Sequence, residues 1–169
     1  AAAWELGIPF ATIRAALADF AGVGRRLELR GEVAGAPWID DYGHHPTEIA
    51  AALAALQVSR RRRIIAVFQP HRYTRTMALL DRFATCFSDA SEVILLPIYP
   101  AGERPIEGVT SAALADAIRR AGGPRVELAA SFEEAACLVE KTLTSADVLL
   151  TIGAGDVYRV GDLAREARR

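Results

Sequence analysis

Short apolar segments alternate with amphipathic helical segments through most of the chain, and this alternation constrains the fold more than any other feature. Alternating strands and helices build a parallel sheet with right-handed crossovers, because each helix returns the chain to the same end of the sheet. The pattern therefore predicts an α/β fold: a Rossmann-like, mostly parallel sheet with helices on both faces. The expected buried strands are residues 64–68, 93–97, 126–129 and 147–152.

Local sequence also specifies a hairpin and two helix starts. Residues 26–33 and 36–39, separated by a turn at Gly35, predict an N-terminal β-hairpin. Ser111 is expected to be an N-cap, and Ser131, with a glutamate three residues later, has the spacing of a capping box.

The first 22 residues predict two short helices, the second with Leu17 and Phe20 on its apolar face. An alanine-rich beginning without a helix cap suggests that residues 1–24 are the tail of a larger upstream part. Residues 25–169 have the length of one main domain.

Charge and hydropathy exclude several classes of partner. The 20 basic and 21 acidic residues nearly cancel, so no overall positive field would attract nucleic acid. The run Arg60 to Arg63 precedes a strand at its amino end, which favours a solvated cationic edge over a phosphate site. No apolar run approaches the roughly 18 residues of a membrane span, and no signal peptide is recognisable, so we expect no membrane partner and a cytoplasmic protein.

Cysteine and lysine usage adds two expectations. Cys86 and Cys137 lie in separate helical patterns and are expected to be small core residues in a reducing compartment. The single lysine, Lys141, follows no glycine-rich loop, so the chain lacks a P-loop. If the protein binds ATP, its main phosphate loop is elsewhere.

Polar turns are expected where the strands end. Because parallel strands end at the same edge of a sheet, turns dense in ionisable side chains imply one shared site. The four turns are residues 40–46, 69–76, 99–103 and 153–156.

The turn at residues 40–46 combines two carboxylates, a phenol and two imidazoles. Asp41 at a strand end could accept hydrogen bonds from ribose hydroxyls, and His44 at a helix start could donate to a phosphate. Alternatively, an aspartate caps the helix and His45 fills a gap in the core. A metal site built from Asp41, His44, His45 and His71 is less favoured, because adjacent histidines point in different directions.

Arg72 and Arg75 are three residues apart at a strand-to-helix turn and could converge on one carboxylate or phosphate. The alternative is a surface ion pair with a residue such as Asp81, which stabilises by only about 0–1 kcal/mol.

The turn at residues 153–156 resembles a dinucleotide fingerprint, but Tyr158 occupies the third glycine position. A glycine turn that lets backbone approach a ligand is the better interpretation, with a plain tight turn as the alternative. In the turn at 99–103, Tyr99 and Glu103 are candidates by position alone.

Four motifs in these turns resemble the carboxy-terminal domain of the Mur ligase family, in particular its alanine-adding branch. The likeness covers nearly all of the chain after Gly24, and residues 1–24 resemble the end of the family's central ATPase domain. The motifs are Asp-Asp-Tyr-Gly-His-His-Pro-Thr-Glu at 40–48, Val-Phe-Gln-Pro-His-Arg-Tyr-Thr-Arg-Thr at 67–76, Tyr-Pro-Ala-Gly-Glu at 99–103 and Thr-x-Gly-Ala-Gly at 151–155.

The resemblance implies an ATP-dependent ligase of peptidoglycan precursor synthesis, which joins L-alanine to UDP-N-acetylmuramic acid through an acyl phosphate. It implies ATP and Mg²⁺ as cofactors, with the phosphate loop and the principal metal ligands in the central domain. The amino-terminal and central domains of the same chain are the implied partners. We therefore expect no metal site in these residues and no activity of this domain alone.

The resemblance also implies roles for single residues. Asp41 and His44 are the cofactor-binding candidates, and His44, near the phosphates or the reacting centre, is the catalytic candidate. Two arginines would steady the alanine carboxylate or the anionic intermediate, and three further residues would line the amino-acid side. These substrate-binding candidates are Arg72, Arg75, Tyr99, Gly153 and Gly155.

Two other functions are compatible with the residues alone. The chain could be a stand-alone nucleotide-binding or amino-acid-binding module without catalysis. It could also be a metal hydrolase that uses His44, His45 and His71.

Overall fold

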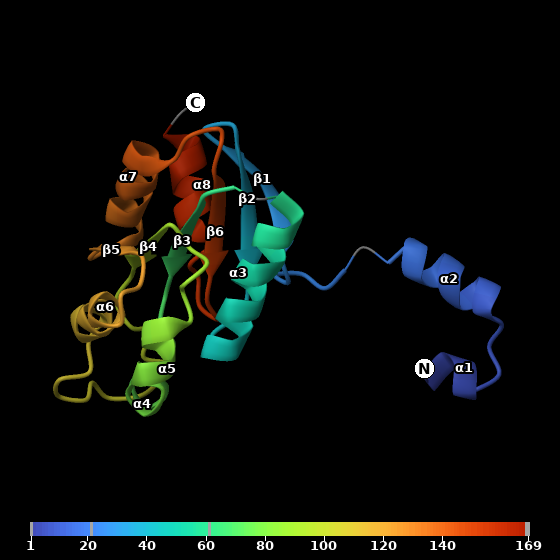
Figure 1. The fold of residues 1–169 in the computed structure, drawn as a ribbon, viewed down its shortest axis with the longest axis horizontal. Coiled ribbons are helices and arrows are strands. Elements are labelled where there is room, and N and C mark those ends of the chain that lie inside the picture. The colour runs from blue at the N-terminus through green and yellow to red at the C-terminus, as the bar shows by residue number, and fades with distance from the viewer. Residues whose placement is uncertain (1, 21, 61, 168–169) are drawn as a thin grey trace.

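Six strands form one sheet in the order β1-β2-β6-β3-β4-β5. The computed structural model describes residues 2–20, 22–60 and 62–167 (Figure 1). β1 is antiparallel to β2, and every other neighbouring pair is parallel. The predicted α/β fold and its N-terminal hairpin are therefore confirmed. The strands are β1 (Glu28–Val33), β2 (Ala36–Asp41), β3 (Ile64–Phe68), β4 (Glu92–Leu95), β5 (Arg125–Leu128) and β6 (Val148–Ile152).

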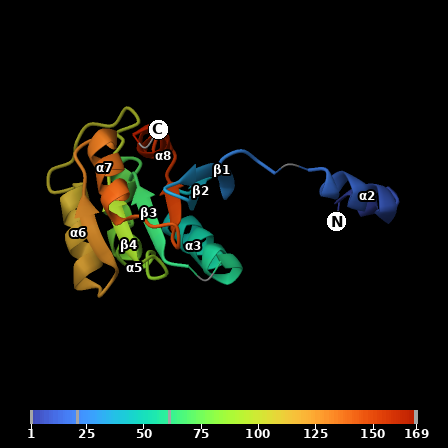
Figure 2. The same cartoon turned by 90° about the horizontal axis from the view of Figure 1, so that it is seen from above.

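Helices cover both faces of the sheet (Figure 2). α3, α5 and α6 pack on one face and α7 and α8 on the other, so two hydrophobic cores form. Of the helices in the described ranges, none is long and apolar enough to cross a membrane. The helices are α1 (Ala2–Glu5), α2 (Phe10–Ala18), α3 (Pro46–Arg60), α4 (Tyr73–Ala78), α5 (Leu80–Thr85), α6 (Ser111–Arg120), α7 (Phe132–Thr142) and α8 (Arg159–Glu166).

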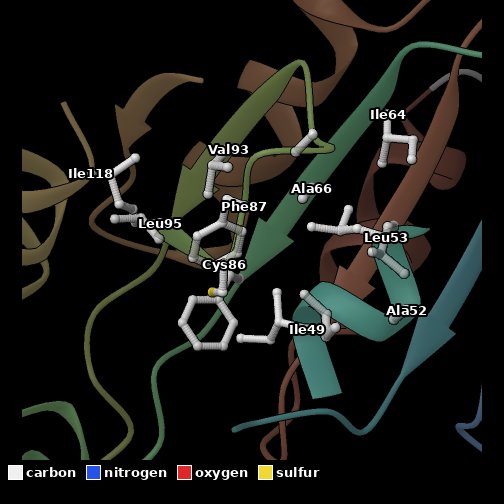
Figure 3. Packing of buried hydrophobic residues seen from close by; sticks show 14 of the residues in the cluster. Ile49, Ala52, Leu53, Ile64, Ala66, Cys86, Phe87, Val93, Leu95 and Ile118 are labelled. Carbon is white, nitrogen blue, oxygen red and sulfur yellow. The ribbon is translucent and has the colours of Figure 1, made fainter. Parts of the chain in front are cut away.

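The central strands β3 and β6 are buried along their whole length, which explains their continuous apolar sequence. Side chains from α3, β4 and the segment after α5 meet in the first core, among them Leu53, Val93 and Phe87 (Figure 3). Phe87 also lies 5.4 Å from Phe68, measured between ring centres. Each such side chain, when fully buried, stabilises the fold by about 1.5–3 kcal/mol.

One of the two predicted helix caps is wrong. Ser131 caps α7 as expected, since its hydroxyl accepts a hydrogen bond from Glu134 N. α6 is instead capped by Thr110, whose hydroxyl accepts from Ala113 N, while the Ser111 hydroxyl donates to Leu96 O at 2.6 Å. Both residues are good caps in isolation, and the contact with Leu96, directly after β4, decides between them.

The cationic run before β3 is also not a purely solvated edge. Arg63 donates to both carboxylate oxygens of Asp147 at 2.9 Å. Burial acts to raise the pKa of Asp147, but hydrogen bonds from Arg63 and Thr144 outweigh it, so the pKa is lowered. The side chains of Arg60 and Arg61 lie outside the described part of the chain.

The two predicted N-terminal helices are present as α1 and α2. They bury no residue and lie apart from the sheet (Figure 1). Trp4, Phe10 and Leu17 are each more than half exposed, and Phe20 lies beyond the end of α2. The assignment of residues 1–24 to another domain stays a prediction.

The two cysteines differ, contrary to the expectation that both lie in the core. Cys86 is buried in the first core (Figure 3), whereas Cys137 lies on the exposed side of α7. Burial raises the pKa of the Cys86 thiol to about 12, so it stays protonated at neutral pH.

We therefore expect one of these two thiols to react quickly with a disulfide reagent such as Ellman's reagent in the native protein. The second should react only after unfolding. Cys137→Ser should abolish the fast phase and leave the slow one. A fast phase that survives this substitution would contradict the burial of Cys86.

Gly161 in α8 is required by its contact with Trp38, because a Cβ at this position would overlap the indole ring. Gly161→Ala should lower the free energy of unfolding by about 1–3 kcal/mol, the usual cost of overpacking. Denaturant titration measures this loss. In a Trp38→Leu background the added methyl group should no longer overlap a ring. The free-energy change of the double variant should therefore be clearly smaller than the sum of the two single changes.

Candidate functional site

The four polar turns lie along one edge of the sheet. β2, β6, β3 and β4 are parallel neighbours in this order, so their carboxyl ends meet there. The predicted gathering of the turns is therefore confirmed, although the binding roles of the residues stay predictions. Backbone hydrogen bonds join neighbouring turns or strand ends, among them Gly153 N to Asp41 O (3.0 Å), Gln69 N to Ile152 O (3.3 Å) and Arg72 N to Tyr99 O (2.8 Å).

Aromatic rings form a row across three of the turns. The Tyr42 ring lies edge-on to His44 at 5.5 Å between ring centres, and His44 lies 6.0 Å from His71. The His71 ring stacks on Tyr99 at 5.3 Å with 21° between the ring planes. The row thus connects the catalytic candidate His44 to the substrate candidate Tyr99.

His71 is neutral near pH 7. Burial lowers the pKa of its imidazole below the ordinary value of 6.5, and the positive charge of Arg75 lowers it further. Arg75 Nη1 lies 3.3 Å from His71 Nδ1. A hydrogen bond donated by the arginine at this distance requires a neutral imidazole, because a protonated ring has no free lone pair to accept it. The sequence identified His71 only as a possible metal ligand, and the structure places it beside Arg75 and stacked on Tyr99.

Arg72 has an unusual backbone conformation. Its φ of 74° lies in a region that costs a side-chain-bearing residue about 1–3 kcal/mol, so the neighbouring structure must hold it. The half-exposed guanidinium lies 3.9 Å from Glu103 Oε1, so its acidic neighbour is Glu103 rather than Asp81. Glu103 also accepts hydrogen bonds from Thr74 N (3.0 Å) and Thr74 Oγ1 (2.6 Å), and these lower the pKa of its carboxyl.

Asp41 is almost fully buried and already has internal partners. Its Oδ1 accepts from Gly43 N at 2.7 Å, and its Oδ2 accepts from Leu27 N at 2.9 Å. A carboxylate has about four lone-pair positions, so each oxygen can accept one further bond. Asp41 borders a hollow of about 360 Å³ that is also lined by Arg26, Leu27, Glu48, Ala51 and Ala52.

The start of α3 was expected to bind an anion from a ligand, but a carboxylate of the protein itself already occupies it. Glu48 Oε2 accepts from His44 N at 2.9 Å and from His45 N at 3.1 Å. Burial acts to raise the pKa of Glu48, but these backbone bonds lower it, so the carboxylate is charged. His45 neither fills the core nor joins the site: its Nδ1 accepts from Thr47 N at 3.3 Å.

The glycine turn fits closely against Gln69. Gly153 has φ +150°, and a Cβ on Gly155 would lie 2.6 Å from Gln69 Oε1. Gln69 is 7% exposed, and its Oε1 has no hydrogen-bond partner. Gln69 belongs to the predicted polar turn at 69–76 but was not predicted to be a site residue, although a polar residue directly after a wholly apolar strand was a usable signal.

No three His, Cys, Asp or Glu side chains of the described ranges are grouped closely enough to hold a metal ion. The histidines of the metal-hydrolase alternative are therefore not arranged as a ligand set.

Residues 25–155 match the family model described as "Mur ligase, glutamate ligase domain". This match covers well over half of the chain. The chain belongs to the Mur ligase family. The matched range contains every candidate residue of the site and, apart from Asp156, all of the four turns.

Relatives in this family share close to half of their aligned residues with the chain. The UDP-N-acetylmuramate–L-alanine ligase of Desulfatibacillum aliphaticivorans is 51% identical over 159 residues, which are 94% of this chain and 35% of that protein. The enzyme of the same name from Geobacter sp. (strain M21) is 50% identical over 163 residues, covering 96% of this chain and 35% of that protein. The crystal structure of UDP-N-acetylmuramate-alanine ligase MurC from Thermotoga maritima has a TM-score of 0.77 at 26% identity, covering 98% of this chain and 35% of that one. The chain thus spans 35% of the length of these Mur ligases.

The charges around His71 in this Mur ligase domain can be tested by NMR titration. Arg75→Gln removes a positive charge and should raise the pKa of His71 toward 6.5, whereas Glu103→Gln removes the negative charge that opposes this shift and should lower it. The pKa of His71 is lower in the folded protein than in the unfolded chain. Below pH 6.5 the unfolded chain therefore binds more protons at this residue than the folded protein does, and the free energy of unfolding should fall as the pH falls. A pKa above 6.5 in the unmodified protein would contradict this arrangement.

Proposed function

We propose that this chain is the carboxy-terminal domain of UDP-N-acetylmuramate:L-alanine ligase, an ATP-dependent enzyme of peptidoglycan precursor synthesis in the cytoplasm. The observation that carries the proposal is the single row formed by His44, His71 and Tyr99, flanked by the nucleotide candidate Asp41 and by Arg72. About 50% identity over more than nine-tenths of the chain with ligases of that name supports it.

In this proposal residues 1–24 are the tail of the central ATPase domain and residues 25–169 are the domain that closes onto it. The exposed apolar side chains of α1 and α2 support this division, because such surfaces normally pack against another part of a protein. Mg²⁺ would be held mainly by the central domain.

The nucleotide side of the proposed site is the turn after β2. Asp41 has lone pairs left for ribose hydroxyls and borders a hollow of about 360 Å³, so the residues present fit a nucleoside. Bound ATP would supply the phosphoryl group that activates the muramic carboxylate. His44 would donate a hydrogen bond to a phosphate oxygen at the end of the row of rings.

The amino-acid side is formed by the turns after β3, β4 and β6. Arg72 and Arg75 would bind the alanine carboxylate through charge-assisted hydrogen bonds. Tyr99, Gly153 and Gly155 would line the space beside it. Closure of the domain would exclude water from the acyl phosphate and would bring the amine of alanine to it.

Arg72→Ala in the full-length ligase should raise the KM for L-alanine by about 10- to 100-fold, the effect of losing a hydrogen bond to a charged group. Phosphate release at varied L-alanine concentration measures this change. Arg120→Ala, at the exposed end of α6, is the matched control and should leave KM unchanged. Normal alanine kinetics in the Arg72 variant would exclude this role.

The 169-residue chain alone should not hydrolyse ATP, since it lacks a phosphate loop, whereas the full-length protein should do so when muramic substrate and L-alanine are present. Both are measured in the same phosphate-release assay. Robust turnover by the isolated chain would refute the proposed division between the domains.

A further inference from the structure

One side chain, Arg25, joins the segment that leads into β1 to two separate turns of the site. Its Nε donates to Asp40 Oδ2 at 2.7 Å, and its Nη2 donates to Gly153 O at 2.8 Å. The guanidinium carbon lies 5.1 Å from the ring centres of both Tyr42 and Tyr158. Arg25 therefore contacts the turn after β2 and the turn after β6 at the same time.

The partner of Arg25 is a carboxylate that depends on it. Asp40 is completely buried, and its Oδ1 accepts from Thr151 Oγ1 at 2.7 Å. Thr151 Oγ1 in turn accepts a hydrogen bond from Trp38 Nε1 at 3.0 Å. Asp40 is therefore linked through Thr151 to the buried indole of Trp38. A buried carboxylate that loses its cation is strongly destabilised, so Asp40 constrains the position of the guanidinium.

The backbone around Arg25 is also held by the first turn. Arg25 and Leu27 have φ values of 57° and 46°, which side-chain-bearing residues rarely adopt. Leu27 N donates to Asp41 Oδ2 at 2.9 Å, and Tyr42 N donates to Arg25 O at 2.7 Å. The bent shape of residues 25–27 and the geometry of the nucleotide candidate Asp41 therefore depend on each other.

We propose that Arg25 is a positioning residue that couples the segment entering the domain to the nucleotide turn and to the glycine turn, so that both turns take their binding geometry together. The coupling requires a planar fork, because a lysine ammonium cannot occupy the Nε and Nη2 positions at once. The inference rests on the proposed function, in which Asp41 contacts ATP and Gly153 lines the amino-acid side. Movement of residues 25–27 during domain closure would then reach both binding turns through one guanidinium.

Hydrogen–deuterium exchange of the full-length protein tests this coupling without relying on activity. Arg25→Lys should speed amide exchange about tenfold or more in peptides covering residues 36–45 and 148–158, since each loses a hydrogen bond to a charged group. Arg30→Lys is the matched control: Arg30 also lies over the Tyr158 ring, at 5.3 Å, and its replacement should change neither peptide. Faster exchange in one peptide only, or in neither, would overturn the proposal.

Peptides from β4 and β5 report whether the variant is folded. If Arg25→Lys also speeds exchange there, Asp40→Asn becomes the deciding variant, because it keeps the shape of the side chain while it removes the charge and one of the two acceptor oxygens. Faster exchange at both turns with unchanged β4 and β5 would support the coupling. Unchanged exchange at residues 148–158 would refute it.

Kinetics of the full-length ligase provide a second readout. Arg25→Lys should raise the KM for ATP and the KM for L-alanine together, each by about tenfold. A merely structural role would reduce the fraction of active enzyme and leave both KM values unchanged. If the unmodified full-length protein showed no ligase activity, the proposed function would be wrong. The exchange measurement would still test the coupling through Arg25, because it does not depend on activity.

Discussion

β6 pairs with β2 on one side and with β3 on the other, and the site depends on these two pairings. They bring the turns that follow three strands to one edge, although those turns are far apart in the sequence. The register of β2 against β6 is marked by the buried bond between Asp40 and Thr151, which lie opposite each other. A slip of one residue would turn the Thr151 hydroxyl to the other face of the sheet and leave the Asp40 carboxylate without it.

Most of the fold could be predicted from the sequence, because buried parallel strands have continuous apolar sequences and their helices have regular apolar stripes. The errors concern features that are decided by distant contacts. Thr110 caps α6 because the neighbouring Ser111 hydroxyl is bonded to Leu96 O, directly after β4. Cys137 was assigned to the core by its residue type, but the buried residues of α7 are Ala135, Ala136 and Val139, and Cys137 is exposed.

The place of the candidate site was predictable for a related reason. Polar turns directly after apolar strands must meet at one edge if the strands are parallel. The partners within that edge were not predictable: Asp41 bonds to Leu27 N, and Glu48 occupies the amides at the start of α3. The role of Arg25 could not be predicted either. An arginine before a strand is common, and only the structure shows its hydrogen bonds to Asp40 and Gly153.

The central place of β6 also affects how the protein is made. Residues 148–152 leave the ribosome after all other strands, yet they fill the gap between β2 and β3. Until then the hairpin and the β3-β4-β5 portion each present an unpaired apolar edge, which is the kind of surface that aggregates in incomplete chains. Nascent chains stalled before β6 should therefore be strong clients of ribosome-associated chaperones.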